Sequence, residues 1–407
     1  MTDSRPEEEQ RAAERLLAGQ AWDDYCDTIR LAGHQIEQLG DGLSNLDRAE
    51  WYRFLTRLMR NGLERFVENR DPGNPRFRDA PWRCFINLQN PDQDHLMAEL
   101  PLGSGKDFII RGERGTVPYF ILSTWTAAEP AVPGASSWAD QGLEGLEDFN
   151  PALLQTGDFI ASGDLQYDAE GRFEIVLSPE PGPGNRLRLD EDTTGIIVRV
   201  VYEDRTSEQP PRFTLTPAEG RRIQPLEPAA LSNNLAKAAQ LVLGYTGLVT
   251  DWWQSFEPRA NQIHFSMERY LSNGGVADRE FGFSAWRKEH NEALVVEFTP
   301  PDCEYWIFQL CNLWQENLDT YEQGNGYINN RTARLEADGS VRVIIADRDP
   351  GIGGNWMDSL SHTQGMMGLR LIQTRGVPVV RCLRGPLEAL ERDGIQALAH
   401  HFEEQEA

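Results

Sequence analysis

The chain has 407 residues, of which 40% are hydrophobic and 9% are aromatic, so it can form a packed core and is not a wholly disordered protein. Its 39 Lys and Arg against 64 Asp and Glu give a formal net charge of −25. Because this charge repels phosphate polyanions and anionic lipid surfaces, we expect neither a nucleic-acid partner nor a membrane partner.

Helical periodicity is the main feature of the first 80 residues. An amphipathic helix is predicted over residues 21–38, ending at Gly-Asp-Gly. A stronger helix is predicted after Ser44, with an acidic start at Asp47 and Glu50. Its apolar side chains recur at spacings of three and four residues, which is typical of one buried face: Trp51, Phe54, Leu55, Leu58, Met59, Leu63, Phe66 and Val67. We therefore assign residues 1–80 to an N-terminal helical segment.

The pattern changes to short apolar runs separated by turn residues over residues 81–225, which predicts a first β-rich region of antiparallel strands. Runs such as KDFIIRG, TVPYFILSTWT and TTGIIVRVVYED are examples. Residues 226–290 are expected to form a helical or irregular connector, because LAKAAQLVLGYTGLV is apolar over a broad helical face.

A second set of strands is predicted over residues 291–385, in runs such as EALVVEFTPP and VPVVRCLRG. Turns join these strands without regular helices between them, which favours an antiparallel β-sandwich or jelly roll as the C-terminal domain. Residues 386–407 are predicted to form a C-terminal helix. The expected fold class is thus mainly β with helical additions (α+β), and no internal repeat is evident beyond the succession of two β-rich regions.

The cysteines and the N-terminal stretch bear on the cellular compartment. Five cysteines, without CxxC spacing, favour reduced thiols over a disulfide framework or a zinc site. The acidic start MTDSRPEEEQ lacks a signal-peptide core, and no apolar run is long enough to span a bilayer. A cytoplasmic protein is expected.

The run DRDPGIGGNWMDSLSHTQGMMGLRLI, preceded by NRTARLEADGSVRVIIA and YWIFQLCNLW, resembles the bacterial domain of unknown function 1214 family over about residues 290–385. The helix AEWYRFLTRLMRNGLE and the segment IIRGERGTVPYFIL are similar to the N-terminal part of full-length members. This resemblance implies a β-sandwich of jelly-roll type with helical additions in soluble bacterial proteins. It implies no reaction and no catalytic residues.

The glycine-rich segment after Ala346 is the most distinctive motif. It lacks the lysine and hydroxyl of a phosphate loop, and Trp356 occupies the place of the last glycine of a dinucleotide motif, so no nucleotide cofactor is predicted. Asp347, Asp349 and Asp358 have part of the spacing of a calcium loop, so calcium or magnesium is an alternative. Turn capping by Asp349 is the simpler interpretation.

A ligand pocket is the favoured interpretation of the same region. We expect Asn355 and Trp356 to be directed by the glycine bend into a hollow lined by aromatic rings and guanidinium groups, which suits a ligand with an apolar body and a polar or acidic group. The alternative for any one of these tryptophans is simple core packing. The predicted ligand-binding residues are Asn355, Trp356, Arg370, Trp314, Tyr327 and Arg331.

His362 is the candidate catalytic residue, because an imidazole can donate and accept a proton near neutral pH. The chain has no nucleophile elbow and no HExxH motif, so whether it is an enzyme is left open. The function expected is binding or conversion of a small organic molecule in the C-terminal β domain. The alternative is a non-catalytic carbohydrate-binding module, or an interaction module that forms a homo-oligomer through its β edges.

Overall fold

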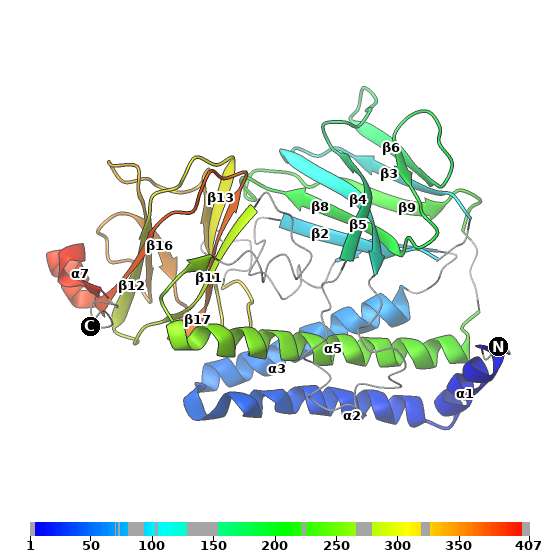
Figure 1. Ribbon diagram of the computed structural model, residues 1–407, viewed down its shortest axis with the longest axis horizontal. Coiled ribbons are helices and arrows are strands. Elements are labelled where there is room, and N and C mark those ends of the chain that lie inside the picture. The colour runs from blue at the N-terminus through cyan, green and yellow to red at the C-terminus, as the bar shows by residue number, and fades with distance from the viewer. Residues whose placement is uncertain are drawn as a thin grey trace.

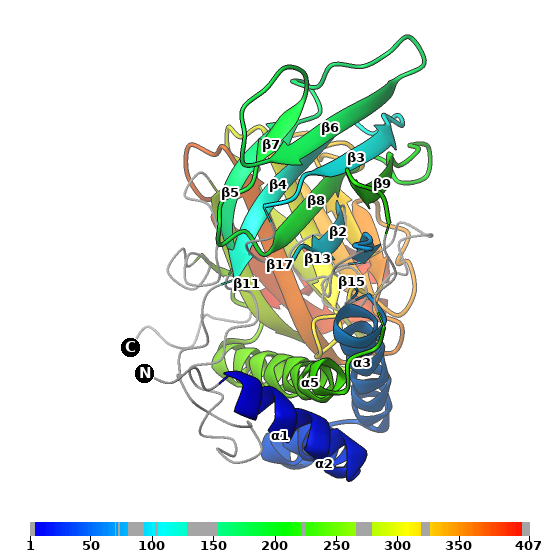
Figure 2. The same ribbon diagram turned by 90° about the vertical axis from the view of Figure 1, so that its right-hand side faces the viewer.

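The computed structural model of the protein places two β-sandwiches side by side along a layer of long helices (Figure 1). Figure 2 shows the same layers from one end, with the helices on one side of the strands. The structure describes residues 5–69, 71, 74–79, 93–101, 105–127, 154–221, 225–265, 279–318 and 326–400.

The helical layer combines the N-terminal helices with one long helix from the middle of the chain. α5 packs against α1, α2 and α3. None of the described helices has both the length and the apolar character needed to cross a lipid bilayer. The elements of the layer are α1 (Arg5–Leu17), α2 (Gln20–His34), η1 (Gln35–Gly42), α3 (Asn45–Leu63), η2 (Glu64–Glu68), α5 (Pro228–Phe256) and η4 (Glu257–Arg259).

Two local features explain how α3 is positioned. It begins at a capping box, in which the Ser44 hydroxyl accepts from the Asp47 amide and the Asp47 carboxylate accepts from the Ser44 amide. Near its other end, a Cβ on Gly62 would lie 2.9 Å from the carbonyl oxygen of Ala238 in α5. Glycine at this position therefore allows the two helix backbones to approach closely.

The first sandwich encloses a core between two sheets, which we name A and B. All strand pairs in these sheets are antiparallel except β6 with β7. In order, sheet A contains β1 (Arg78–Asp79), β2 (Gln93–Glu99), β8 (Gly195–Val201), β4 (Tyr119–Ala127) and β5 (Leu154–Ala161). Sheet B contains β7 (Arg186–Arg188), β6 (Arg172–Ser178), β3 (Phe108–Glu113) and β9 (Arg212–Pro217).

The second sandwich is built in the same way from sheets C and D, and α7 (Leu387–Asp393) with η5 (Ile395–Ala397) follows its strand β18. In order, sheet C contains β10 (His264–Phe265), β11 (Arg279–Arg287), β17 (Gln364–Ile372), β13 (Tyr305–Cys311) and β14 (Tyr327–Asn329). Sheet D contains β16 (Asn355–Asp358), β15 (Val341–Ala346), β12 (Glu292–Phe298), β18 (Val380–Pro386) and β19 (Ala399–His400).

The two sandwiches have the same topology. Sheet A has the order β1-β2-β8-β4-β5, and sheet C has the order β10-β11-β17-β13-β14. The order β7-β6-β3-β9 of sheet B likewise corresponds to β16-β15-β12-β18 of sheet D, and the pairs β6–β7 and β15–β16 are both parallel. A long helix precedes each sandwich, α3 in one case and α5 in the other. The chain therefore contains two copies of one helix-plus-sandwich unit.

A tightly packed glycine recurs near the start of the middle strand of sheets A and C, although its indole comes from β4 in sheet A and from the non-corresponding strand β11 in sheet C. A Cβ on Gly195 would lie 2.3 Å from the Ala98 carbonyl oxygen and 2.7 Å from the indole nitrogen of Trp125. A Cβ on Gly365 would lie 2.2 Å from the Cys311 carbonyl oxygen and 2.7 Å from the indole nitrogen of Trp286. In each copy, a buried indole fills the space that the glycine leaves.

The predicted α+β class with N-terminal helices and two β-rich regions is confirmed, but two boundaries are wrong. The expected connector over residues 226–290 is a regular helix, α5, followed by β10 and β11, which belong to sheet C. The expected helix over residues 386–407 is limited to α7, η5 and the short strand β19 within the described residues. Residue 81, where the first β-rich region was expected to begin, lies outside the described residues.

Candidate functional site

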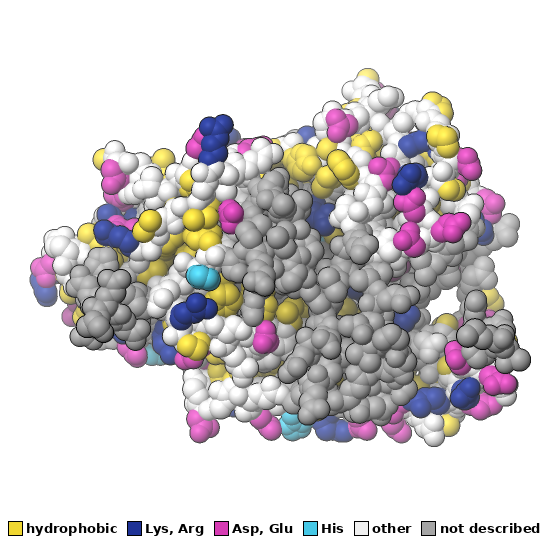
Figure 3. Space-filling view, viewed as in Figure 1, with side chains coloured by type: hydrophobic (Ala, Val, Ile, Leu, Met, Phe, Trp, Pro, Cys, Tyr) yellow, Lys and Arg dark blue, Asp and Glu magenta, His cyan; other side chains and the backbone are white. Residues whose placement is uncertain are grey.

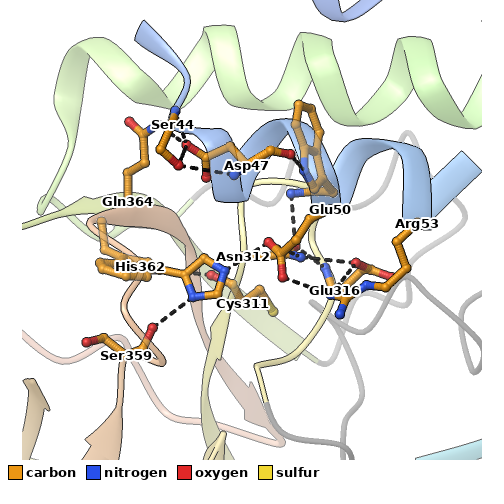
Figure 4. Close-up of polar contacts among 12 residues, drawn as sticks. Ser44, Asp47, Glu50, Arg53, Cys311, Asn312, Glu316, Ser359, His362 and Gln364 are labelled. Carbon is orange, nitrogen blue, oxygen red and sulfur yellow. Dashed lines mark hydrogen bonds and ion pairs between the residues drawn. The ribbon is translucent and has the colours of Figure 1, made fainter. Parts of the chain in front are cut away.

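A network of buried polar side chains joins α3 to the second sandwich (Figure 4). Glu50 extends from α3 toward His362, which lies in the turn before β17, and toward Asn312, which follows β13. All three side chains are buried. Buried polar groups are costly unless they are paired, so such a network is a candidate site with defined geometry.

The backbone that holds His362 is unusual. The His362 amide donates to the Ser359 carbonyl at 2.8 Å, and the two residues between them, Leu360 and Ser361, have φ of 48° and 64°. Neither residue is glycine, so this turn stores conformational strain of about 1–3 kcal/mol per residue. Strain of this kind persists only where surrounding contacts enforce it, and here the buried His362 supplies such contacts.

Both ring nitrogens of His362 face hydrogen-bond acceptors. Nε2 lies 2.9 Å from Glu50 Oε2, and Nδ1 lies 2.8 Å from the Ser359 carbonyl oxygen. Because an imidazole can donate from both nitrogens only when it is protonated, this arrangement favours an imidazolium paired with a carboxylate. Burial lowers the pKa of His362, but the hydrogen bond and charge of Glu50, with the Ser359 carbonyl, raise it above its ordinary value.

Glu50 is also linked to a second buried carboxylate. Burial raises the pKa of Glu50, but the hydrogen bond and charge of His362, followed by the charge of Arg53, lower it below its ordinary value. The Asn312 amide donates to Glu50 Oε2 and to Glu316 Oε2, at 3.0 Å each. Burial raises the pKa of Glu316, although the charges of Arg57 and Arg53 oppose this rise.

The network continues toward solvent through Gln364. Its amide nitrogen donates to Asp47 Oδ2 at 3.0 Å, and its amide oxygen accepts from Arg287 Nη2 at 3.3 Å. Arg287 Nη2 also donates to Glu257 Oε1 at 2.9 Å. The side chain of Asn261 exchanges two 2.9 Å hydrogen bonds with the Arg287 backbone and thereby positions that residue at the end of β11.

A cavity of about 240 Å³ opens beside Gln364 and Arg287, where η1, the end of α5 and sheet C meet. Its wall includes the Trp253 indole and Leu39. Gln364 and Trp253 are buried, whereas the rim residues Gln38 and Gln254 are exposed. The full lining is Gln38, Leu39, Gly42, Leu43, Trp253, Gln254, Glu257, Arg287 and Gln364. The arrangement can hold a small molecule between an apolar wall and a guanidinium group.

The thiol nearest to this network is not suited to nucleophilic chemistry. Cys311 is completely buried, and burial together with the charge of Glu316 raises its pKa well above the ordinary value. A thiol with a raised pKa is protonated at neutral pH and is a poor nucleophile. The network therefore holds charged side chains in a defined geometry, but Cys311 adds no reactive thiolate to it.

One solved structure decides the family of this chain. An uncharacterized protein from Burkholderia cenocepacia is 32% identical, with a TM-score of 0.78, and the alignment covers 93% of this chain and 100% of that one. The chain belongs to the family of that protein. The VPA0106 protein from Vibrio parahaemolyticus is 12% identical, with coverage of 88% and 98% and a TM-score of 0.41. No protein-family model and no curated protein matches the chain.

The expected hollow shared by Asn355 and Trp356 is wrong. Consecutive side chains of a strand point to opposite faces, and these two residues lie side by side in β16. The Asn355 amide is buried and is bound to the backbone of Arg334 and Arg342. The Trp356 indole donates to the Ala346 carbonyl at 3.0 Å and packs on the outer face of sheet D. Asn355 and Trp356 stabilise the sheet from its two sides.

The other predicted ligand-binding residues do not converge either. Trp314 is completely buried against Trp51, with ring centroids 4.6 Å apart, so core packing is the correct interpretation. Arg370 and Tyr327 lie buried on sheet C, where the Arg370 guanidinium is 5.2 Å from the Phe281 ring. Arg331 is exposed, and its Nη1 lies 3.6 Å from Glu203. These residues fill or border the sandwich and do not form one pocket.

The three aspartates of the supposed calcium loop have separate partners. Asp347 pairs with the buried Lys288 at 3.1 Å and with the Ser359 hydroxyl. Asp349 and Asp358 each accept a backbone amide two residues ahead, which is turn capping. Within the described residues, no three His, Cys, Asp or Glu side chains are grouped so that they could hold a metal ion. The structure thus does not assemble the predicted ion site.

His362 is the predicted residue that belongs to the network, whereas Glu50, Arg287 and Gln364 were missed. A partial signal existed for Glu50, because it lies next to Trp51 on the apolar face of a strongly periodic helix, where a carboxylate needs a partner. No such signal could identify that partner, since 312 residues separate Glu50 from His362. Arg287 and Gln364 belong to no sequence motif. Only the pairing of β11 with β17 places them opposite each other, and that pairing could not be predicted from the sequence.

Proposed function

We propose that the protein binds a small organic molecule with an acidic group in the cavity beside Arg287 and Gln364. The observation that carries the proposal is a single cavity in which a guanidinium, an amide and an indole wall come together at the sandwich–helix junction. The proposed ligand class is the one expected from the sequence. The guanidinium that binds the acidic group is now Arg287, whereas the sequence indicated Arg370.

Arg287 supports an acidic ligand because its donors are only partly used. Its Nη2 group contacts Glu257 and Gln364. Within the described residues, its Nε and Nη1 groups have no hydrogen-bond partner. A guanidinium presents its donors in a rigid fork that matches the two oxygens of a carboxylate. The Asn261 bonds to the Arg287 backbone fix the base of this side chain before any ligand arrives.

The size and wall of the cavity restrict the ligand further. A volume of about 240 Å³ lies below the range of roughly 300–1,000 Å³ that is usual for drug-sized ligands. Trp253, Leu39 and Leu43 supply an apolar surface opposite the polar groups. A compact organic acid with a short or planar apolar body fits these properties.

The proposal is one of binding. His362 does not line the cavity, and both of its ring nitrogens are already hydrogen-bonded to the protein. Its part is positioning, because it fixes the segment that leads directly into Gln364. The negative charge of Glu257 beside Arg287 limits affinity for anions until the ligand displaces that contact.

The same proposal places the protein in the bacterial cytoplasm, without a nucleic-acid partner or a required metal, and within the domain of unknown function 1214 family. The free thiols of Cys26, Cys303, Cys311 and Cys382 fit a reducing compartment. The net charge of −25 fits the absence of polyanionic partners. Association into a homo-oligomer is also part of this proposal and is open to measurement by light scattering.

A thermal-shift screen with small carboxylic acids tests the binding function. Ligands that bind the folded state raise its melting temperature, so at least one acid should stabilise the wild-type protein. Leu39→Trp, which fills the cavity, and Arg287→Met, which removes the guanidinium, should each abolish the shift. Arg384→Met is the matched control, because it removes a partly buried Arg–Glu pair from sheet D, away from the cavity.

Two results would count against the proposal. One is that no carboxylic acid shifts the melting temperature of the wild type. The other is that a shift survives unchanged in folded Leu39→Trp, which would place the ligand elsewhere in the molecule.

A further inference from the structure

The outer faces of sheets B and D correspond in topology but differ in how far a helix covers them. On sheet D, α7 covers the apolar part of the outer face through Leu387 and Leu390, and Glu297, Arg342 and Arg381 form ion pairs on the rest of that face. On sheet B, the corresponding outward positions carry charged side chains that are exposed to solvent. Sheet B lies on the far side of its sandwich from the helices, so the helical layer does not cover this face (Figure 2). In the second sandwich, α7 thus covers part of this sheet face, whereas in the first sandwich the helical layer leaves the face uncovered.

The open face of sheet B contains a groove of about 770 Å³. This volume falls within the range of roughly 300–1,000 Å³ that is usual for ligand sites. The groove is lined by three arginines and three acids. Arg111–Glu174 at 2.9 Å and Arg212–Glu113 at 3.8 Å pair across neighbouring strands, and Arg172 pairs at 2.9 Å with Asp168 in the turn before β6. These charges cancel, although the whole chain carries −25.

We propose that this groove binds a neutral oligosaccharide. Neighbouring sugar hydroxyls form donor–acceptor pairs that match the forked donors of a guanidinium and the two oxygens of a carboxylate. Alternating Arg and acid side chains along the groove offer both kinds of partner within one ion pair. Val176, partly exposed on the outer face of β6 and part of the groove lining, adds an apolar contact for the C–H face of a sugar.

Charge balance selects this occupant over other classes. A polyanion would meet three carboxylates for its three guanidiniums, within a strongly negative protein. An amphipathic helix of the kind that covers sheet D would bury ion pairs without replacing their hydration. Figure 3 shows both acidic and basic side chains on the first sandwich among the described residues.

Calorimetric titration of the full chain with cellohexaose, maltohexaose and xylohexaose, preceded by a glycan array, tests this site. At least one neutral oligosaccharide should bind the wild type. Arg111→Gln with Glu174→Gln should weaken that binding about tenfold or more, and Thr214→Trp should block the groove. The matched control is Arg375→Gln with Asp302→Asn, an exposed pair at 3.1 Å on the second sandwich, which should leave binding unchanged.

The outcomes separate clearly. Absence of binding by every neutral oligosaccharide, or binding by anionic saccharides only, would overturn the proposal. Binding that is unaffected in folded Arg111→Gln/Glu174→Gln and in folded Thr214→Trp would overturn it as well. The result is independent of the acid-binding cavity, because that cavity lies at the second sandwich.

Discussion

Two copies of one sandwich dock on the same helical layer through buried carboxylates, but the partners of those carboxylates differ. At the first junction, Glu99 of sheet A accepts from Arg65 Nε at 2.8 Å and from Arg78 Nη2 at 2.5 Å. At the second junction, Glu50 of α3 pairs with the imidazole of His362 at 2.9 Å. Guanidinium groups stay charged at all ordinary pH values, whereas an imidazole titrates near neutrality.

Topology alone therefore does not determine how a junction responds to its surroundings. Burial raises the pKa of Glu99, but the charges and hydrogen bonds of Arg78 and Arg65 lower it to about 2. The first junction is permanently ionised near neutral pH. The second junction depends on a proton on His362, and the acid-binding cavity that we propose opens beside that junction.

Neutralising the permanent junction should cost the most stability. Glu99→Gln would leave two guanidiniums, of which Arg78 is almost completely buried, without a compensating carboxylate. We expect a loss of about 3–5 kcal/mol in the free energy of unfolding, measured by chemical denaturation. Glu170→Gln, which breaks the exposed Arg172 pair, is the control and should cost less than about 0.5 kcal/mol. Equal losses in the two variants would show that the first junction is not held by its charges.

The paired glycines test whether the two sandwiches are built alike. Gly195→Ala and Gly365→Ala each place a Cβ within 2.3 Å of a backbone carbonyl oxygen, so each should lower the free energy of unfolding by about 1–3 kcal/mol. Gly163→Ala is the control, because nothing lies within 4 Å of its Cβ position. If only one of the two glycines were sensitive, the correspondence of the packing would fail at that strand.

His362→Gln should have a smaller effect than Glu99→Gln. The new amide can still donate to Glu50, and Arg53 continues to compensate the Glu50 charge at 2.8 Å. We expect a loss of about 1–2 kcal/mol, measured by the same denaturation experiment. A loss as large as that of Glu99→Gln would mean that the imidazolium carries the second junction alone.

The pH dependence of stability should be the weakest of these effects and the most specific to the second junction. Because the pKa of His362 is raised above 6.5 in the folded state, its stabilisation is complete below pH 6.5 and is lost as pH rises through the raised value. Burial also raises the pKa of Glu316, so this residue adds a further loss of folding stability that begins above pH 4.5. The lowered pKa values of Glu50 and Glu99 act oppositely, since their stabilisation is present above pH 4.5 and is lost on acidification.

Denaturation midpoints between pH 6 and 9 isolate the histidine. The wild type should lose stability over this interval, and His362→Gln should lose less. Glu170→Gln, which changes an exposed pair far from the histidine, is the control and should keep the wild-type profile. A wild-type profile that is flat, or a slope that persists fully in His362→Gln, would contradict the assignment of the slope to this residue.

Local patterns in the sequence predict the elements that depend on neighbouring residues. The apolar spacing after Ser44 predicts α3, and the run LAKAAQLVLGYTGLV predicts the central part of α5. Alternation and turn residues predict strands such as β8 and β12. These elements follow from periodicity and capping, which act within a few residues.

Features that depend on long-range pairing could not be predicted in this way. The duplicated topology could not be recognised in the sequence, because corresponding strands of the two sandwiches share a hydrophobic pattern but no sequence motif. Asn355 and Trp356 were misplaced because the glycine bend ends at Gly354 and a strand with alternating faces begins directly after it. His362 stands out in the sequence as a lone histidine in a polar segment, but its partner Glu50 is brought to it only by the docking of α3.

The pKa of His362 decides whether the second junction is held by an ion pair, and NMR titration of the imidazole signal that disappears in His362→Gln measures it. We predict a pKa above 6.5 in the wild type and a lower value in Glu50→Gln, because the carboxylate stabilises the protonated ring. A wild-type pKa at or below 6.5, or a value that Glu50→Gln leaves unchanged, would contradict this prediction.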